Sequence, residues 1–183
     1  MSETVTSPLV WLDMEMTGLE PKVCVPLQVA VVITDSDLHE LEVMEAVIWQ
    51  PECVLARMDP FVRRMHTDNG LLDRVRGSAH GLADVERDVM SVVSRWCPYR
   101  SGVLAGNSIH SDRAFIKEYF PTLHGYLHYR MVDVSSIKEL VWRWHGPDRM
   151  FVKRPSNHTA LDDVRDSIAE LRYYRAEVMR VGA

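Results

Sequence analysis

The chain begins with short apolar runs that are typical of strands. Residues 9–12 are apolar and are followed at once by acidic residues, which predicts a strand that ends in acids. Residues 27–34 and 42–49 are rich in Val and Ile, and the Asp-Ser-Asp stretch at 35–37 supplies turn-forming side chains between them. The first part of the chain therefore predicts antiparallel strand pairing.

From about residue 59 the hydrophobic period changes from strand-like to helical. Apolar side chains recur at helical spacing between residues 81 and 96. A shorter helix is expected over 112–119, with Ala114, Phe115 and Ile116 partly buried. Further along, the pattern predicts strands over 103–105 and 131–134, a helix from a cap at Ser135 or Ser136 through Trp144, and a last helix over 162–180.

This order of elements predicts the fold class. Strands come first, and helices and strands then alternate, which is typical of a mixed sheet with helices on its faces. The chain has 183 residues, a length that fits one domain. We therefore expect a single α/β domain over residues 1–183, with 1–7 as a disordered tail.

Composition and charge restrict the classes of partner. The longest uninterrupted apolar run is 29–33, far below the ~20 residues of a membrane span. Residues 1–8 lack the basic start and apolar stretch of a signal peptide, so a reducing, cytoplasmic location is expected. The net charge of −5 argues against gripping a long nucleic-acid duplex. It leaves room for a small substrate, including a very short nucleic acid held by a few local cations.

Four carboxylates stand at the edges of the predicted elements. Asp13 and Glu15 are two residues apart, so their side chains share one face of an extended strand. Asp112 opens a helix and Asp163 lies near the start of the last helix, where an N-cap and a helix-dipole contact are the plainer roles. Clustered carboxylates repel each other unless a cation holds them, and oxygen ligands favour Mg²⁺ or Mn²⁺.

Such a cluster suggests phosphoryl chemistry. Two divalent ions held ~3.5–4 Å apart stabilise the attacking and leaving oxygens of an in-line displacement. His158 precedes Asp163 by five residues, so a neutral imidazole could take the proton of the attacking water there. A surface histidine is the plainer reading of His158.

Three stretches of the sequence resemble the motifs of a known enzyme superfamily. Residues 13–19 read Asp-Met-Glu-Met-Thr-Gly-Leu, residues 106–113 contain Gly-Asn-Ser-Ile-x-x-Asp-Arg, and residues 158–163 read His-Thr-Ala-Leu-Asp-Asp. These resemble the three motifs of the DEDD exonucleases in their histidine-containing branch. The His-Tyr-Arg at 128–130 and the Asp-Val-Ser at 133–135 make the chain similar to the oligoribonuclease family over nearly its whole length.

The resemblance implies a fold, an activity and a set of site residues. It implies a ribonuclease-H-like fold and 3′-to-5′ hydrolysis of very short RNAs, chiefly dinucleotides, to mononucleotides. It also implies two divalent ions, Mg²⁺ or Mn²⁺, and a homodimer. The implied roles are metal ligands for Asp13, Glu15, Asp112 and Asp163, general base for His158, contacts to the 5′ phosphate for Ser108, Arg130 and Ser135, a wedge between the bases for Leu19, and a reach into the partner's site for Tyr129.

The chain departs from the family pattern at three places. Gln28 stands where relatives usually carry an acid, which we expect to alter local hydrogen bonding without loss of the metals. Phe61 stands where many relatives carry Trp, and its aromatic face should still stack on a base. Residues 146–156 match no pattern; their basic side chains could attract phosphate, but a solvated, mobile loop is the favoured interpretation.

Other functions fit parts of the sequence. A broader 3′-to-5′ exonuclease acting on tRNA tails or single-stranded DNA would use the same acidic motifs. A silent module that binds dinucleotides is a second alternative, but such a module would be expected to lose a ligand or the base. The Asn-His-Thr at 157–159 matches a glycosylation pattern by chance, and the three cysteines lack the spacing of a zinc site.

Overall fold

A computed structural model describes residues 7–153 and 159–179. It has a five-stranded sheet in the order β3-β2-β1-β4-β5. The strand β1 pairs antiparallel with β2, which pairs antiparallel with β3, whereas β4 lies parallel to β1 and β5 parallel to β4. The expected mixed sheet is confirmed. The strands are β1 (Leu9–Met16), β2 (Pro26–Thr34), β3 (Glu40–Val47), β4 (Val103–Gly106) and β5 (Met131–Asp133).

The first strand carries the acids, as the sequence pattern predicted. It runs from Leu9 to Met16 and so ends one residue beyond Glu15. Asp13 pairs with Ala30 and Glu15 with Gln28, so both acids lie within the sheet. The buried strand β2 offers backbone partners along this whole length, and these partners override the low strand propensity of acidic residues.

Four of the helices correspond to predicted ones, with small shifts at their starts. They are α4 (Leu82–Trp96), α5 (His110–Tyr119), α7 (Val134–His145) and α8 (Ala160–Glu177). The shorter helices α1 (Glu52–Leu55), α2 (Pro60–Asp68), α3 (Leu71–Gly77) and α6 (Pro121–Tyr126) and the 3₁₀ turn η1 (Pro147–Arg149) were not predicted. None of the helices in the described ranges combines the length and apolar character that crossing a bilayer requires.

Two details of the helices correct the sequence analysis. The N-cap of α7 is Asp133, whose carboxylate accepts the N–H of Ser135, so neither Ser135 nor Ser136 is the cap. The helix α5 starts two residues before Asp112, and its Ala114 is exposed while Phe115 and Ile116 are fully buried. A carboxylate two residues before an N–H is a stronger cap than a serine inside the helix, which explains the first shift.

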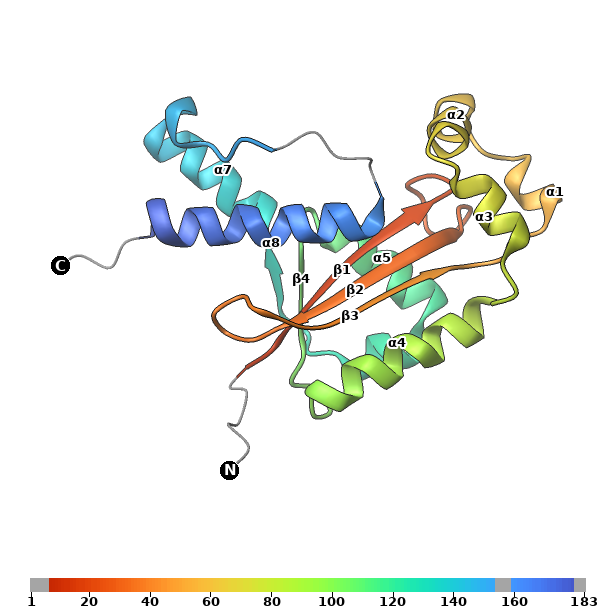
Figure 1. The fold of residues 1–183 in the computed structure, drawn as a ribbon, viewed down its shortest axis with the longest axis horizontal. Coiled ribbons are helices and arrows are strands. Elements are labelled where there is room, and N and C mark those ends of the chain that lie inside the picture. Colours follow the sequence, from red (N-terminus) through yellow and green to blue (C-terminus); the bar gives the residue numbers. More distant parts are fainter. Residues whose placement is uncertain (1–6, 154–158, 180–183) are drawn as a thin grey trace.

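The sheet separates two layers of helices. Val10, Leu12 and Met14 of β1 pack on one face against α4, α5 and α6. Trp11 points to the other face, where α7 and α8 cover the sheet. Figure 1 shows α8 crossing over one side of the strands and α4 lying along the other. Because side chains alternate along β1, Asp13 and Glu15 share the Trp11 face and point toward α8.

A third cluster of apolar side chains closes one end of the sheet. The helices α1, α2 and α3 lie beyond the tip of the β1 arrow in Figure 1. Their apolar core contains Leu27 of β2 together with Leu55, Met58, Leu71, Leu72 and Val75. This helical cap therefore lies beside the end of β1 that carries the acids.

Candidate active site

Three carboxylates meet where the end of β1 faces the start of α8. Asp13 and Glu15 come from the strand and Asp163 from the first turn of the helix. One carboxylate oxygen of each lies within 4.8 Å of the others. The sequence expectation that separated segments bring acids together is thus met by the geometry of these three.

Asp112 reaches the same region from the opposite layer. It lies in the first turn of α5, is only 6% exposed, and its Oδ1 accepts the backbone N–H of Met14 at 3.0 Å. This bond ties the helix to the strand between the two acids of β1. Asp112 is close enough to raise the pKa of both Asp13 and Glu15.

Burial and mutual repulsion govern the electrostatics of this cluster. Burial, followed by the charge of Asp112, Glu15 and Asp163, raises the pKa of Asp13 well above its usual range. Burial and the charges of Asp163 and Asp112 raise the pKa of Glu15 to about 7. Burial also raises the pKa of Asp112 to about 7, although the N–H of Met14 lowers it in part. Four acids held together in this way create a strong demand for positive charge.

The donor set fits a hard divalent cation. Every donor in the cluster is a carboxylate oxygen, which Mg²⁺ and Mn²⁺ prefer over the nitrogen and sulfur donors of zinc or copper sites. Asp13, Glu15 and Asp163 are partly buried rather than solvated at the surface. A cation bound there would relieve the repulsion that burial enforces.

Lys153 supplies positive charge to this cluster. Its Nζ lies 2.5 Å from Oδ1 of Asp163 and 3.2 Å from Oδ2 of Asp166. Residues 146–156 were expected to form a solvated loop. Lys153 is exposed in this loop, and its ammonium group also contacts α8.

Ser108 and Ser135 are brought together as the sequence analysis predicted. Their hydroxyl oxygens lie 3.2 Å apart, and the N–H of Ser108 donates to Oγ of Ser135 and to Oδ1 of Asp133, at 3.0 Å each. Ser108 has a φ of 49°, so the left-handed turn after β4 turns its backbone toward the start of α7. The hydroxyl of Ser135 donates to Oδ1 of Asn107.

Asn107 fixes this pair of serines to the last helix. Its Nδ2 donates to Oγ of Ser167 at 3.0 Å and to Oε2 of the buried Glu170 at 3.1 Å. The network thus links the serines to the same helix that carries Asp163. The supporting role of Asn107, Ser167 and Glu170 could not be predicted from the sequence, because their contacts join residues about 60 positions apart.

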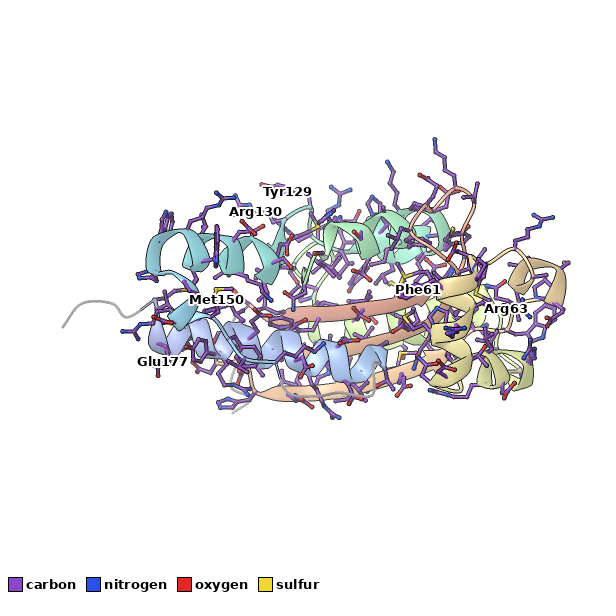
Figure 2. The ribbon with its side chains drawn as sticks, turned by 90° about the horizontal axis from the view of Figure 1, so that it is seen from above. Phe61, Arg63, Tyr129, Arg130, Met150 and Glu177 are labelled. Atoms are coloured by element: carbon purple, nitrogen blue, oxygen red, sulfur yellow. The ribbon has the colours of Figure 1, made fainter. Side chains whose placement is uncertain are left out.

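Arg130 and Tyr129 form a local pair on the surface. The guanidinium of Arg130 lies over the Tyr129 ring at 5.5 Å, and its Nε donates to the Tyr129 hydroxyl at 3.1 Å. Figure 2 shows the two side chains next to each other on the outer face of the molecule. Among the described residues, the Arg130 side chain makes no hydrogen bond to Ser108 or Ser135, so the three-residue phosphate pocket stays a prediction.

The backbone of the His-Tyr-Arg segment is held by Arg113. Its guanidinium donates to the carbonyl of His128 at 2.9 Å and to that of Arg130 at 3.4 Å. Arg113 directly follows Asp112 on α5. One turn of helix therefore positions both an acid of the cluster and the segment that carries Arg130.

The two side chains expected to contact bases are exposed. Leu19 is 86% exposed and Phe61 is 75% exposed. Leu19 follows β1 by three residues, and Phe61 lies at the start of α2, where Figure 2 shows it near the end of the sheet. A Cβ on the preceding Gly18 would lie 2.7 Å from the sulfur of Cys24, which accounts for glycine in this turn.

His66 joins α2 to the end of β1. It is fully buried, its Nε2 contacts the carbonyl oxygen of Met16 at 2.9 Å, and its Nδ1 lies 3.9 Å from Oε2 of Glu15. The helix that carries Phe61 is thereby tied to the strand that carries the acids. The sequence analysis missed His66, and its only signal was a polar side chain on the buried side of an amphipathic helix.

Gln28 lies beside Glu15 in the adjacent strand. It is 1% exposed, and its amide donates to Oε1 of Glu45, which also accepts a bond from Arg74. The effect of Gln28 in place of an acid stays a prediction. His158 lies outside the described residues, as does Arg154, so the role predicted for His158 stays a prediction.

The comparisons with known proteins agree with this fold and site. The RNase T exonuclease family model matches residues 10–171. An oligoribonuclease from Pseudomonas aeruginosa is 45% identical over 174 residues, which is 94% of this chain and 97% of the relative. One from Neisseria meningitidis serogroup B is 46% identical over 168 residues, or 91% of this chain and 90% of the relative.

Solved structures show the same fold at low identity. Exonuclease I of E. coli in complex with a dT13 oligonucleotide has a TM-score of 0.76 at 16% identity, covering 96% of this chain and 42% of that one. Exonuclease I from Methylocaldum szegediense has a TM-score of 0.71 at 19% identity, covering 94% and 41%. The chain thus spans less than half the length of these exonucleases, and the likeness establishes the fold alone.

The fold and the acidic site together define a ribonuclease-H-like exonuclease domain. The near full-length identity goes further: the chain belongs to the RNase T exonuclease family and, within it, to the oligoribonucleases.

Proposed function

We propose that this protein is a 3′-to-5′ exoribonuclease that hydrolyses very short RNAs, chiefly 5′-phosphorylated dinucleotides, to mononucleotides. The observation that carries the proposal is 45% identity to oligoribonucleases over 94% of the chain, joined to a partly buried acidic cluster at the matching motifs. The chain acts as one domain over residues 1–183 in the cytoplasm; of the proposed tail 1–7, the structure describes only Ser7.

The metal ligands in this proposal are Asp13, Glu15, Asp112 and Asp163. They hold two divalent ions, Mg²⁺ or Mn²⁺, which supply Lewis-acid charge to the phosphodiester when bound. The raised pKa values of Asp13 and Glu15, to which the charges of neighbouring acids contribute, support the assignment, because a structural role for these acids would not require them to repel each other. His158 takes the proton of the attacking water.

The remaining residues hold the substrate. Ser108, Ser135 and Arg130 bind the terminal 5′ phosphate, for which the hydroxyl of Ser108, held next to that of Ser135, provides a donor. Leu19 and Phe61 contact the bases, and their high exposure leaves both side chains free to do so. The protein is a homodimer in which Tyr129, 72% exposed in one chain, reaches the partner's site.

The function is tested with purified protein and a 5′-phosphorylated diribonucleotide in Mg²⁺ or Mn²⁺. Hydrolysis to mononucleotides that EDTA stops is expected. Alanine at Asp13, Glu15, Asp112 or Asp163 should each nearly abolish it, while Asp73→Ala, at an exposed first-turn acid of α3, should not. Binding of the dinucleotide without turnover would instead identify a silent binding module.

A further inference from the structure

Lys153 makes a contact that neither the family motifs nor the proposed mechanism uses. Its ammonium group lies between Oδ1 of Asp163, at 2.5 Å, and Oδ2 of Asp166, at 3.2 Å. The two acids are three residues apart in α8, so their side chains lie on the same face of the helix. One lysine therefore contacts an acid of the cluster and its neighbour one turn further along.

The charge of Lys153 reaches beyond this pair. It opposes the rise in the pKa of Asp13, although its direct contact is with Asp163. The two carboxylates are each about one-quarter exposed, and the lysine is about half exposed. The ammonium thus faces the acidic cluster from the solvent side, where it can leave without disrupting the core.

A lysine on the oxygen of a metal ligand is a competitor for the metal. An ammonium group 2.5 Å from Oδ1 of Asp163 takes up part of that oxygen's acceptor capacity and repels a divalent ion at the same carboxylate, so the two cations compete. Asp166 offers the lysine another partner one turn away. Another lysine near this helix, Lys138, does not approach the cluster in this way: it pairs with Glu170, about two turns of α8 after Asp163.

We propose that Lys153 is a competing cation that exchanges with divalent metal at Asp163, and that Asp166 retains its ammonium when the metal binds. This inference rests on the proposed function, because it takes Asp163 as a metal ligand. The exchange lowers the affinity for metal and keeps positive charge next to the cluster at all times. Lys153 is therefore a residue that sets the metal requirement of the enzyme.

Calorimetric titration of Mn²⁺ into the full-length, EDTA-treated protein without RNA tests the proposal. Lys153→Met should bind Mn²⁺ about three- to tenfold more tightly, since one nearby repelling charge is gone. Lys153→Arg keeps the charge and should stay near wild type. Lys117→Met, at an exposed lysine of α5, controls for the change in net charge and should stay within about twofold.

The role of Asp166 is tested by a double-mutant cycle. Asp166→Asn should weaken Mn²⁺ binding more in the wild-type protein than in Lys153→Met, because only the former has a lysine to return to Asp163. Unchanged or weaker binding by Lys153→Met, or equal effects of Asp166→Asn in both backgrounds, would overturn the inference. Asp13→Asn separates the two claims: if it binds Mn²⁺ normally, the proposed metal site itself fails.

Discussion

At the scale of single residues, burial raises the pKa of both Glu15 and Asp112 to about 7, and for Glu15 the charges of Asp163 and Asp112 add to the rise. In the unfolded chain both groups would lose their protons near pH 4 to 4.5. Between these values the folded protein binds more protons than the unfolded chain. The stability that this contributes is present at low pH and is lost as the pH rises through about 7.

The first prediction follows from this loss of stability with rising pH. In EDTA, the free energy of unfolding should fall by about 1–3 kcal/mol between pH 5 and pH 8. Added Mn²⁺ should restore stability most at pH 8, where the acids are ionised. Asp13→Asn should flatten the fall, because it removes one of the repelling charges. Urea unfolding at a series of pH values measures all three, and a stability that rises across this range in EDTA would contradict the electrostatics described.

His158 gives the second prediction at this scale. His158→Ala should lose about two to four powers of ten in kcat, the usual contribution of a general base, while Mn²⁺ binding is kept. The rate of the wild-type enzyme should also fall as the histidine is protonated at low pH. Stopped-flow turnover and calorimetry check the two properties separately. Normal kcat, or a loss of metal binding, would remove His158 from the role of base.

Arg130 gives the third prediction. Removal of the 5′ phosphate from the dinucleotide should weaken binding about ten- to a hundredfold, because a charge-assisted hydrogen bond contributes roughly 1.5–3 kcal/mol. Arg130→Ala should cause a similar loss on the phosphorylated dinucleotide and little further loss on the other. The four dissociation constants, of the wild-type protein and Arg130→Ala for the dinucleotide with and without its 5′ phosphate, are measured by equilibrium binding in Ca²⁺ in place of Mg²⁺ or Mn²⁺. Additive losses would show that Arg130 and the phosphate do not interact.

At the scale of elements, α5 links the acidic cluster to the predicted phosphate pocket through Arg113. Arg113→Lys keeps the charge but loses the planar fork that reaches the carbonyls of His128 and Arg130. We predict a KM about tenfold higher for the 5′-phosphorylated dinucleotide, with Mn²⁺ affinity unchanged. Steady-state kinetics with and without the 5′ phosphate measures it. Equal effects on both substrates would show that Arg113 does not act through this segment.

The elements also show how far the sequence could predict the structure. The strands and the four longer helices have clear apolar patterns, so they were predicted within a few residues. The strand β1 was predicted to end in the acids, and its pairing with β2 keeps Asp13 and Glu15 extended. The helices α1, α2 and α3 were not predicted, since these short helices are stabilised by apolar contacts with β2 and with each other.

At the scale of the whole molecule, the site depends on contacts between distant parts of the chain. The acids could be chosen from the motifs, but the N–H of Met14 that fixes Asp112 is 98 positions away along the chain. His66 and Lys153 carry no motif, and their contacts with Met16 and Asp163 arise only when α2 and α8 pack on the sheet. Local patterns thus predicted which acids cluster, whereas the residues that support them could be found only from the tertiary structure.

We propose that the protein acts chiefly on the shortest RNAs, because the predicted phosphate pocket of Ser108, Arg130 and Ser135, one linkage from the acids, would leave no place for a third nucleotide. The most direct test is a series of 5′-labelled RNAs of two to seven nucleotides, compared by kcat/KM in Mn²⁺. We predict that the dinucleotide is hydrolysed at least tenfold more efficiently than the seven-nucleotide RNA. Equal or faster turnover of the longer RNA would contradict the claim and identify a broader 3′-to-5′ exonuclease.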